Sequence, residues 1–127
     1  MAERLHISSG SPFEPLIGIS RAVRAGERVI VSGTAPIWAD GSCDPDPELQ
    51  ANRCLEIICD ALLDAGASPG DVVRTRIYLT DGSDWEAVSR AHRHVFGEAR
   101  PASTMVIVSG FLDERWKVEI EAEAIVL

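Results

Sequence analysis

The stretch WKVEIEAEAIVL, residues 116–127, alternates apolar and charged side chains and decides how the fold is read. Successive side chains of a β-strand point to opposite faces, so one face of this stretch is apolar and the other is charged. The charged face holds Lys117, Glu119, Glu121 and Glu123. Neighbouring carboxylates repel one another. Either water covers that face, or arginines of an adjacent strand pair with the acids, or one acid takes part in chemistry.

A second stretch, VVRTRIYLT at residues 72–80, supplies suitable arginines. As a strand it places Arg74, Arg76 and Tyr78 on one face, with Thr75 and apolar residues on the other. If this strand neighbours residues 116–127, arginines and glutamates meet on one face. We interpret the pattern as ordinary cross-strand ion pairing. The alternative is that one glutamate is left over as a base.

The elements before residue 72 form a hairpin and a helix. Residues 17–33, IGISRAVRAGERVIVSG, predict two strands around an Ala25-Gly26 turn, where glycine accepts a positive φ. Asp46 is placed to cap a helix that begins at Pro47 and ends at Gly66. Together these residues predict ββα.

The elements after residue 80 complete the order. Ser83 and Glu86 have the spacing of a capping box and predict a second helix that ends at Gly97. Residues 103–109, STMVIVS, add a strand before the closing one. The predicted order is ββαβαββ, an α+β fold in a single domain spanning residues 1–127.

Two of these strands are apolar on both faces, at VIV (29–31) and MVIV (105–108). Such strands are typical of sheets covered on both sides. Two helices cannot cover both faces of this sheet. We therefore expect a second copy of the chain to cover the open face.

Composition excludes several classes of function. The chain has 127 residues and a formal net charge of −8, which disfavours nucleic acid as a partner. The N-terminal residues do not resemble a signal peptide, and no apolar run approaches the ~20 residues of a membrane-spanning helix, so we expect a cytoplasmic protein and no membrane partner. Cys43, Cys54 and Cys59 form no CxxC pair, which argues against a disulfide framework and a zinc site.

His92 is the second candidate for chemistry after the glutamates. It lies on the apolar stripe of the predicted helix, whereas His94 does not. A histidine in this position either makes a hydrogen bond in the core or acts as a ligand or acid–base group. The two histidines are two residues apart and do not share a helix face, so they are not a metal pair. A Ser or Cys nucleophile with a recognisable base is not evident from the motifs.

Four motifs together resemble the RidA (YjgF) family of reactive-intermediate deaminases. They are SRAVRAGERVIVSGTAPI, LLDAGASPGDVVRTRIYLTD, RPASTM and VEIEAEAIV, and the resemblance runs from about residue 17 to residue 126. It implies a chorismate-mutase-like ββαβαββ fold with one mixed sheet and two helices on one face. It also implies a homotrimer with ligand clefts between subunits.

The resemblance further implies a reaction. In RidA proteins an arginine binds the carboxylate of a 2-imino or 2-enamino acid, and a glutamate on the last strand helps water to attack the imine carbon. Glu119 aligns with that glutamate. Ser103 stands where the family has the arginine, and Ile19 where it usually has a tyrosine. Both departures alter the family's substrate site.

We therefore expect a small-molecule site with Glu119 as the catalytic carboxylate and His92 as a proton donor in place of the tyrosine. Arg76, Ser103 and Thr104 are expected to bind the substrate, and the remaining candidate contacts are Ile19, Ser32, Gly33 and Arg100. Arg100 has an alternative role as a charge near the helix end. Trp38 and Trp116 are candidates for an aromatic wall or for the core.

The expected protein binds a small carbonyl, imine or enamine compound and hydrolyses imines with release of ammonia, without a metal or organic cofactor. The alternative is a non-catalytic trimer that binds a metabolite or a partner protein. A ribonuclease activity, often attached to this family by name, fits poorly with the charge of −8.

Overall fold

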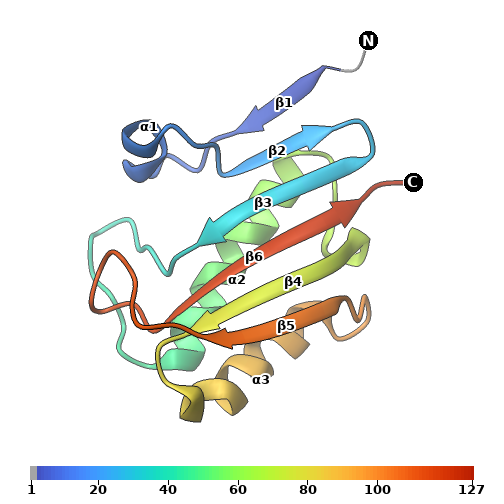
Figure 1. Ribbon diagram of the computed structural model, residues 1–127. Helices are drawn as coiled ribbons and strands as arrows, with labels where there is room; N and C mark the ends of the chain where they lie inside the picture. Colours follow the sequence, from blue (N-terminus) through green and yellow to red (C-terminus); the bar gives the residue numbers. More distant parts are fainter. Residues whose placement is uncertain (1–2) are drawn as a thin grey trace.

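The computed structural model describes residues 3–127, which form one six-stranded sheet with the order β1-β2-β3-β6-β4-β5 (Figure 1). Strands β4 and β5 are parallel, and all other neighbours are antiparallel. The elements are β1 Arg4–Ile7, α1 Phe13–Ile17, β2 Ala22–Ala25, β3 Arg28–Thr34, α2 Pro47–Asp64, η1 Pro69–Asp71, β4 Val72–Leu79, η2 Gly82–Asp84, α3 Trp85–Phe96, β5 Ala102–Ile107 and β6 Val118–Ile125.

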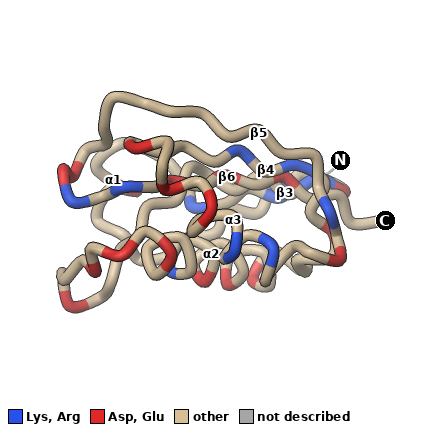
Figure 2. Tube along the Cα trace, turned by 90° about the horizontal axis from the view of Figure 1, so that it is seen from below, with Lys and Arg blue, Asp and Glu red and all other residues tan. Residues whose placement is uncertain are grey.

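Helices α2 and α3 lie side by side on one face of the sheet, as predicted. In Figure 2 they form one layer and the strands form the other. The connection from β3 through α2 to β4 and that from β4 through α3 to β5 both step in the same direction across the sheet. Right-handed crossovers that step in one direction place their helices on the same face. The opposite face is left without a helix.

The core lies between this helix layer and the sheet. The apolar half of β6 is nearly inaccessible to solvent: Val118, Ile120, Ala122 and Ala124 are at most 2% exposed. They belong to one buried cluster with α2 residues that include Leu55, Ile58 and Leu62. Each fully buried branched side chain stabilises the fold by about 1.5–3 kcal/mol. Burial of this half of β6 directs its glutamates to the open face.

The N-terminal part of the sheet differs from the prediction. Strand β1 and the short helix α1 were not predicted, and β1 pairs with β2 as a sixth strand. The hairpin does not begin at residue 17, because residues 13–17 form α1 and β2 begins at Ala22. Its turn is Gly26-Glu27 rather than Ala25-Gly26, since Ala25 pairs with Arg28. Gly26 has a φ of 62°, the left-handed region that glycine adopts readily.

Of the two predicted helix caps, the one at Asp46 is present and the one at Ser83 is not. The Asp46 side chain accepts a hydrogen bond from the Leu49 amide, as expected for a cap before Pro47. The Ser83–Glu86 capping box is absent: the Ser83 hydroxyl donates to Asp81 at 2.8 Å, and η2 precedes α3. An aspartate two residues upstream therefore binds the serine that was expected to cap the helix. In the part of the chain from residue 3 onward, no helix is long and apolar enough to cross a membrane.

Candidate functional site

The open face of the sheet carries the predicted contact between arginines and glutamates. Strands β4 and β6 are antiparallel neighbours, and Arg76 lies directly opposite Glu121. The Arg76 guanidinium is 3.0 Å from Glu121 and 3.8 Å from Glu123. The Tyr78 hydroxyl also donates to Glu121, at 2.9 Å. Two of the three carboxylates are thus paired, which confirms the ion-pairing interpretation for them.

Glu119 is the third of these carboxylates, and the pairing of β4 with β6 gives it no arginine partner. Its partner across the ladder is Tyr78, whose hydroxyl is bound to Glu121 instead. Within residues 3–127 the Glu119 carboxylate accepts no side-chain hydrogen bond and forms no ion pair. Burial raises the pKa of Glu119; the charge of Arg21 opposes this shift and that of Glu121 adds to it. A half-buried carboxylate with a raised pKa is a group suited to accept a proton near neutral pH.

Gly33 leaves room for this carboxylate. The pairing of β3 with β6 is irregular between Val31 and Thr34, so Gly33 lies at a bulge. A Cβ atom on Gly33 would lie 3.4 Å from Glu119 Oε1. The Ser32 hydroxyl donates to the Ser20 carbonyl at 2.7 Å and so fixes the preceding loop. Ser32 thus has a structural contact, whereas Gly33 borders the acid.

Thr104 shares the open face with Arg76, because the two are register partners on the parallel strands β4 and β5. Strand β5 is the edge of the sheet, and all six of its residues are exposed. An exposed edge strand with unpaired backbone groups invites another chain. The structure therefore gathers Glu119, Gly33, Arg76 and Thr104 on the open face.

His92 and Ser103 lie on the other face of the sheet. The buried Thr75 hydroxyl is 2.8 Å from His92 Nε2 and donates to the Ser103 hydroxyl, also at 2.8 Å. Burial lowers the pKa of His92, whose ring lies 5.0 Å from that of Phe96. Within one chain the sheet separates this hydrogen-bonded set from Glu119. His92 points inward as predicted, and His94 is exposed.

The remaining candidates lie apart from this group. Ile19 is exposed in the loop after α1, and its amide donates to the Glu14 carbonyl. Arg100 is exposed beyond the end of α3; its amide donates to the Phe96 carbonyl, and its φ of 47° is in the left-handed region. Trp116 is 7% exposed and packs edge-on against Phe13, with ring centroids 5.8 Å apart. Trp116 is therefore a packing residue.

Comparison with known proteins decides the family. A family model described as endoribonuclease L-PSP matches residues 11–126. A crystal structure of Rv2704 from Mycobacterium tuberculosis, a member of the YjgF/YER057c/UK114 family, superposes with a TM-score of 0.90 at 44% identity, covering 98% of this chain and 100% of that one. The chain belongs to the RidA (YjgF) family. The family resemblance inferred from the four motifs is thereby confirmed, as is the α+β fold.

Other RidA-family relatives have names that indicate chemistry. The 2-iminobutanoate/2-iminopropanoate deaminase of Salmonella typhimurium is 32% identical over 109 residues, 83% of this chain and 84% of the relative. A crystal structure of Escherichia coli TdcF with bound serine has a TM-score of 0.81 and 25% identity, covering 96% of this chain and 94% of that one. The family thus includes deaminases of reactive intermediates, and a member binds a small amino acid.

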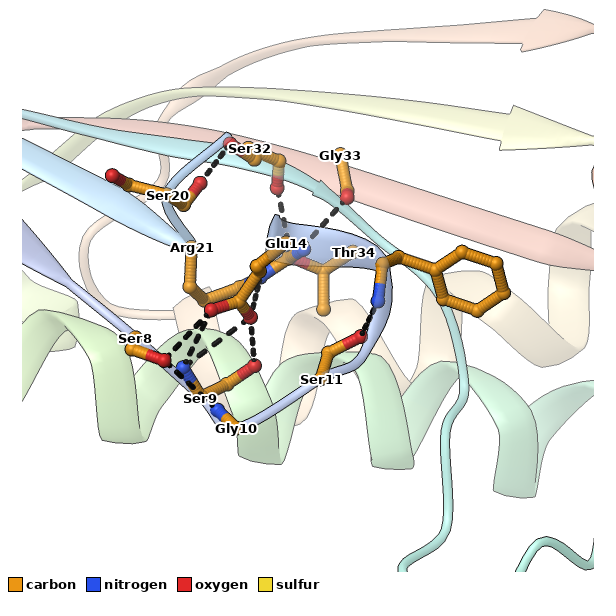
Figure 3. Close-up of polar contacts among 11 residues, drawn as sticks. Ser8, Ser9, Gly10, Ser11, Glu14, Ser20, Arg21, Ser32, Gly33 and Thr34 are labelled. Atoms are coloured by element: carbon orange, nitrogen blue, oxygen red, sulfur yellow. Dashed lines mark hydrogen bonds and ion pairs between the residues drawn. The ribbon is translucent and has the colours of Figure 1, made fainter. Parts of the chain in front are cut away.

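Sequence reasoning missed one polar cluster of this RidA-family chain, which we call the Glu14–Arg21 pair (Figure 3). Glu14 and Arg21 are 4% and 6% exposed, with Arg21 Nε 3.5 Å from Glu14 Oε2. The carboxylate points at the turn that precedes α1 and accepts hydrogen bonds from the Ser8 hydroxyl and from the Ser9 amide and hydroxyl. Arg21 Nη1 donates to the Gly33 carbonyl at 2.8 Å and to the Thr34 hydroxyl at 3.0 Å. Isolated charges have no periodicity, so nothing in the sequence signalled their burial.

The donor set of the described chain does not suggest a metal centre. Among residues 3–127, no three His, Cys, Asp or Glu side chains are grouped so that they could hold a metal ion. Cys54 is buried and Cys59 is half-buried on α2, and burial raises the pKa of both thiols. Neither thiol is activated as a nucleophile or ligand.

Proposed function

We propose that the chain hydrolyses a small imine or enamine, releasing ammonia and a carbonyl compound, with Glu119 as the catalytic base. The observation that carries the proposal is Glu119 itself, a half-buried carboxylate without a partner among the described residues and with a pKa raised chiefly by burial. The deaminases among its relatives support this choice of reaction. Arg76 and Thr104 would contact the substrate from β4 and β5.

The reaction needs only proton transfers and water. Glu119 takes a proton from water while the oxygen attacks the C=N carbon, and the imine nitrogen gains a proton from solvent to give a carbinolamine. The protonated Glu119 then returns its proton to the amino group, and the C–N bond breaks as the hydroxyl proton is lost to solvent and the C=O bond forms. The products are a carbonyl compound and ammonia, and the carboxylate is regenerated. Burial of Glu119 favours this exchange because it destabilises the charged form of the acid.

We further propose that a homotrimer completes the cleft. The open face exposes apolar side chains beside the ion pairs: Ile30 is 44% exposed, Val106 40% and Ile125 37%. The exposed edge strand β5 extends this surface next to Thr104. Contact with another copy would bury these groups and place residues of a second chain near Glu119. The cytoplasmic location expected from the sequence stays a prediction.

The test measures ammonia and 2-keto acid released from imines that an amino-acid oxidase generates in the same solution. The wild-type chain should accelerate release for at least one side chain, and Glu119→Gln should abolish the acceleration. Glu123→Gln is the matched control, because Glu123 lies on the same strand and face but is ion-paired with arginines. Light scattering should give a trimer for all three proteins. An active Glu119→Gln protein would eliminate Glu119 as the base.

A non-catalytic binding trimer is the second candidate, and two contacts favour it. Ser103 stands in place of the family arginine and is bound to Thr75, while Arg76 is held by Glu121 and Glu123. These side chains already have partners within the chain, so neither offers a free charge for a substrate carboxylate. This second function would be established if a ligand binds saturably in the cleft on the open face while no imine yields ammonia or 2-keto acid.

A further inference from the structure

A cavity of about 430 Å³ opens beside α2, and Arg21 is part of its lining. It lies between the Ser9–Pro12 turn, the segment that follows β3 and the outer side of α2. None of the open-face residues Glu119, Arg76 and Thr104 lines it. Its volume is within the range of small-molecule sites, roughly 300–1,000 Å³. The proposed deaminase reaction makes no use of this cavity.

Arg21 is one of two arginines that line the cavity, and its hydrogen bonds are incomplete. Although Arg21 is only 6% exposed, its Nε is a buried donor without a hydrogen-bond acceptor among the described residues. The hydrogen bonds of its guanidinium all leave from Nη1. The Glu14 carboxylate, 3.5 Å from Nε, is occupied by the Ser8 and Ser9 donors (Figure 3). The buried Nε is closed off by Glu14, so an acceptor in the cavity would bind the Nη2 amino group, for which the described residues supply no acceptor.

The rest of the lining suits an organic acid. Arg53 contributes a second cation, held in place by a 2.7 Å hydrogen bond from its Nε to the Ile37 carbonyl. Trp38 and Ile57 form an apolar wall. Arginine binds carboxylates through paired, charge-assisted hydrogen bonds, and an aromatic wall suits a flat apolar body. Charge and apolar surface thus meet within one cavity.

We propose that this cavity binds a small aromatic or branched aliphatic carboxylic acid. Its carboxylate accepts hydrogen bonds from Arg21 and lies near Arg53, and its apolar part packs against Trp38. The cavity has a lining of its own, which includes none of Glu119, Arg76 and Thr104. It borders the imine site through Arg21, whose Nη1 donates to the carbonyl of Gly33, the residue beside the Glu119 carboxylate.

The first test uses the wild-type protein and calorimetric titration with phenylacetate, isovalerate and indole-3-acetate. Each acid is compared with its amide, which has the same shape without the charge. At least one acid should bind saturably and about tenfold or more tightly than its amide, the size of effect expected from charge-assisted hydrogen bonds. Equal binding of acid and amide, or binding of none of the three acids, overturns the proposal.

Variants then locate the bound acid. Arg21→Gln and Trp38→Ala should each weaken binding by about tenfold or more, since each removes a contact of this size. Trp85→Ala is the matched control, a 53% exposed tryptophan on α3 outside the cavity. Trp38→Ala leaves the Glu14–Arg21 pair intact and so decides the matter if Arg21→Gln does not fold. Glu119→Gln should bind the acid at least as tightly as the wild type does, because it removes a negative charge near Arg21. Loss of binding in that variant alone places the acid in the imine cleft and refutes the cavity site.

Discussion

Separate and combined replacement of Glu14 and Arg21 should show that their buried pair anchors the N-terminal part of the sheet. Both side chains are almost inaccessible to solvent and lie 3.5 Å apart. Removal of one member of a buried ion pair typically costs about 3–5 kcal/mol, because the other charge is left uncompensated. The two single variants should differ within this range, since the two groups have different remaining contacts.

In Arg21→Met the Glu14 carboxylate keeps its hydrogen bonds from Ser8 and Ser9, so the loss should be near the lower end, about 3 kcal/mol. In Glu14→Gln the guanidinium keeps its bonds to the Gly33 carbonyl and Thr34 but has no counter-charge, so the loss should be nearer about 5 kcal/mol. The double variant should lose less than the sum of the two, with a coupling free energy of about 1–3 kcal/mol.

The assay is urea unfolding at pH 7 with equal protomer concentrations, because oligomers are stabilised by mass action. A pH series adds an independent measurement. Burial alone would raise the pKa of Glu14, but hydrogen bonds from Ser9 and Ser8 and the charge of Arg21 outweigh it and lower the pKa below 4.5. A carboxylate with a lowered pKa stabilises the fold above its unfolded pKa, and the contribution is lost as pH falls through the folded pKa. Wild-type stability should therefore fall in that acid window, and Glu14→Gln should fall less.

Two results would refute this reasoning. Coupling within about 0.5 kcal/mol of zero would mean that the side chains act independently, as distant sites do. A larger loss in Arg21→Met than in Glu14→Gln would mean that the serine donors do not stabilise the isolated carboxylate.

Three further outcomes are expected. Thr75→Val should lower the free energy of unfolding by about 1–3 kcal/mol in urea, because it leaves the His92 imidazole and a β5 hydroxyl without their shared partner. Gly66→Ala should cost about 1–2 kcal/mol by the same measurement, since Gly66 has a φ of 80° and its Cβ would lie 2.8 Å from an Arg24 nitrogen. Glu119→Gln should stabilise the protein at pH 7, because a raised pKa means that folding opposes the charged form; thermal unfolding should show this gain shrinking as the pH falls and wild-type Glu119 becomes protonated.

The paired strands were predictable because their signals are long and periodic. The eight residues of β6 and residues 74–79 of β4 alternate without interruption, so the sequence indicated which of these side chains share a face, and the pairing placed Arg76 opposite Glu121. The pairing is irregular between Val72 and Arg74, and Val72 is buried there while Val73 is exposed, contrary to the expected alternation. Strand β1 has only four residues, too few for alternation to stand out, and α1 has five. The separation of His92 from Glu119 agrees with two sequence patterns, because a helix packs its apolar stripe, here with His92, on the apolar face of the sheet, whereas Glu119 lies on the charged face.

The different surroundings of the three glutamates of β6, Glu119, Glu121 and Glu123, link the fold to the proposed chemistry. Alternation forces all three glutamates onto the open face once the apolar half of β6 is buried against the helices. On strand β4, Arg74 and Arg76 lie opposite two of these glutamates. The residue opposite Glu119 is Tyr78, which carries no positive charge. Tyr78 gives its hydroxyl hydrogen to Glu121, and Gly33 supplies no side chain to cover the remaining acid. A tyrosine instead of an arginine opposite Glu119 therefore leaves this carboxylate available as a base, whereas Glu121 is held in an ion pair.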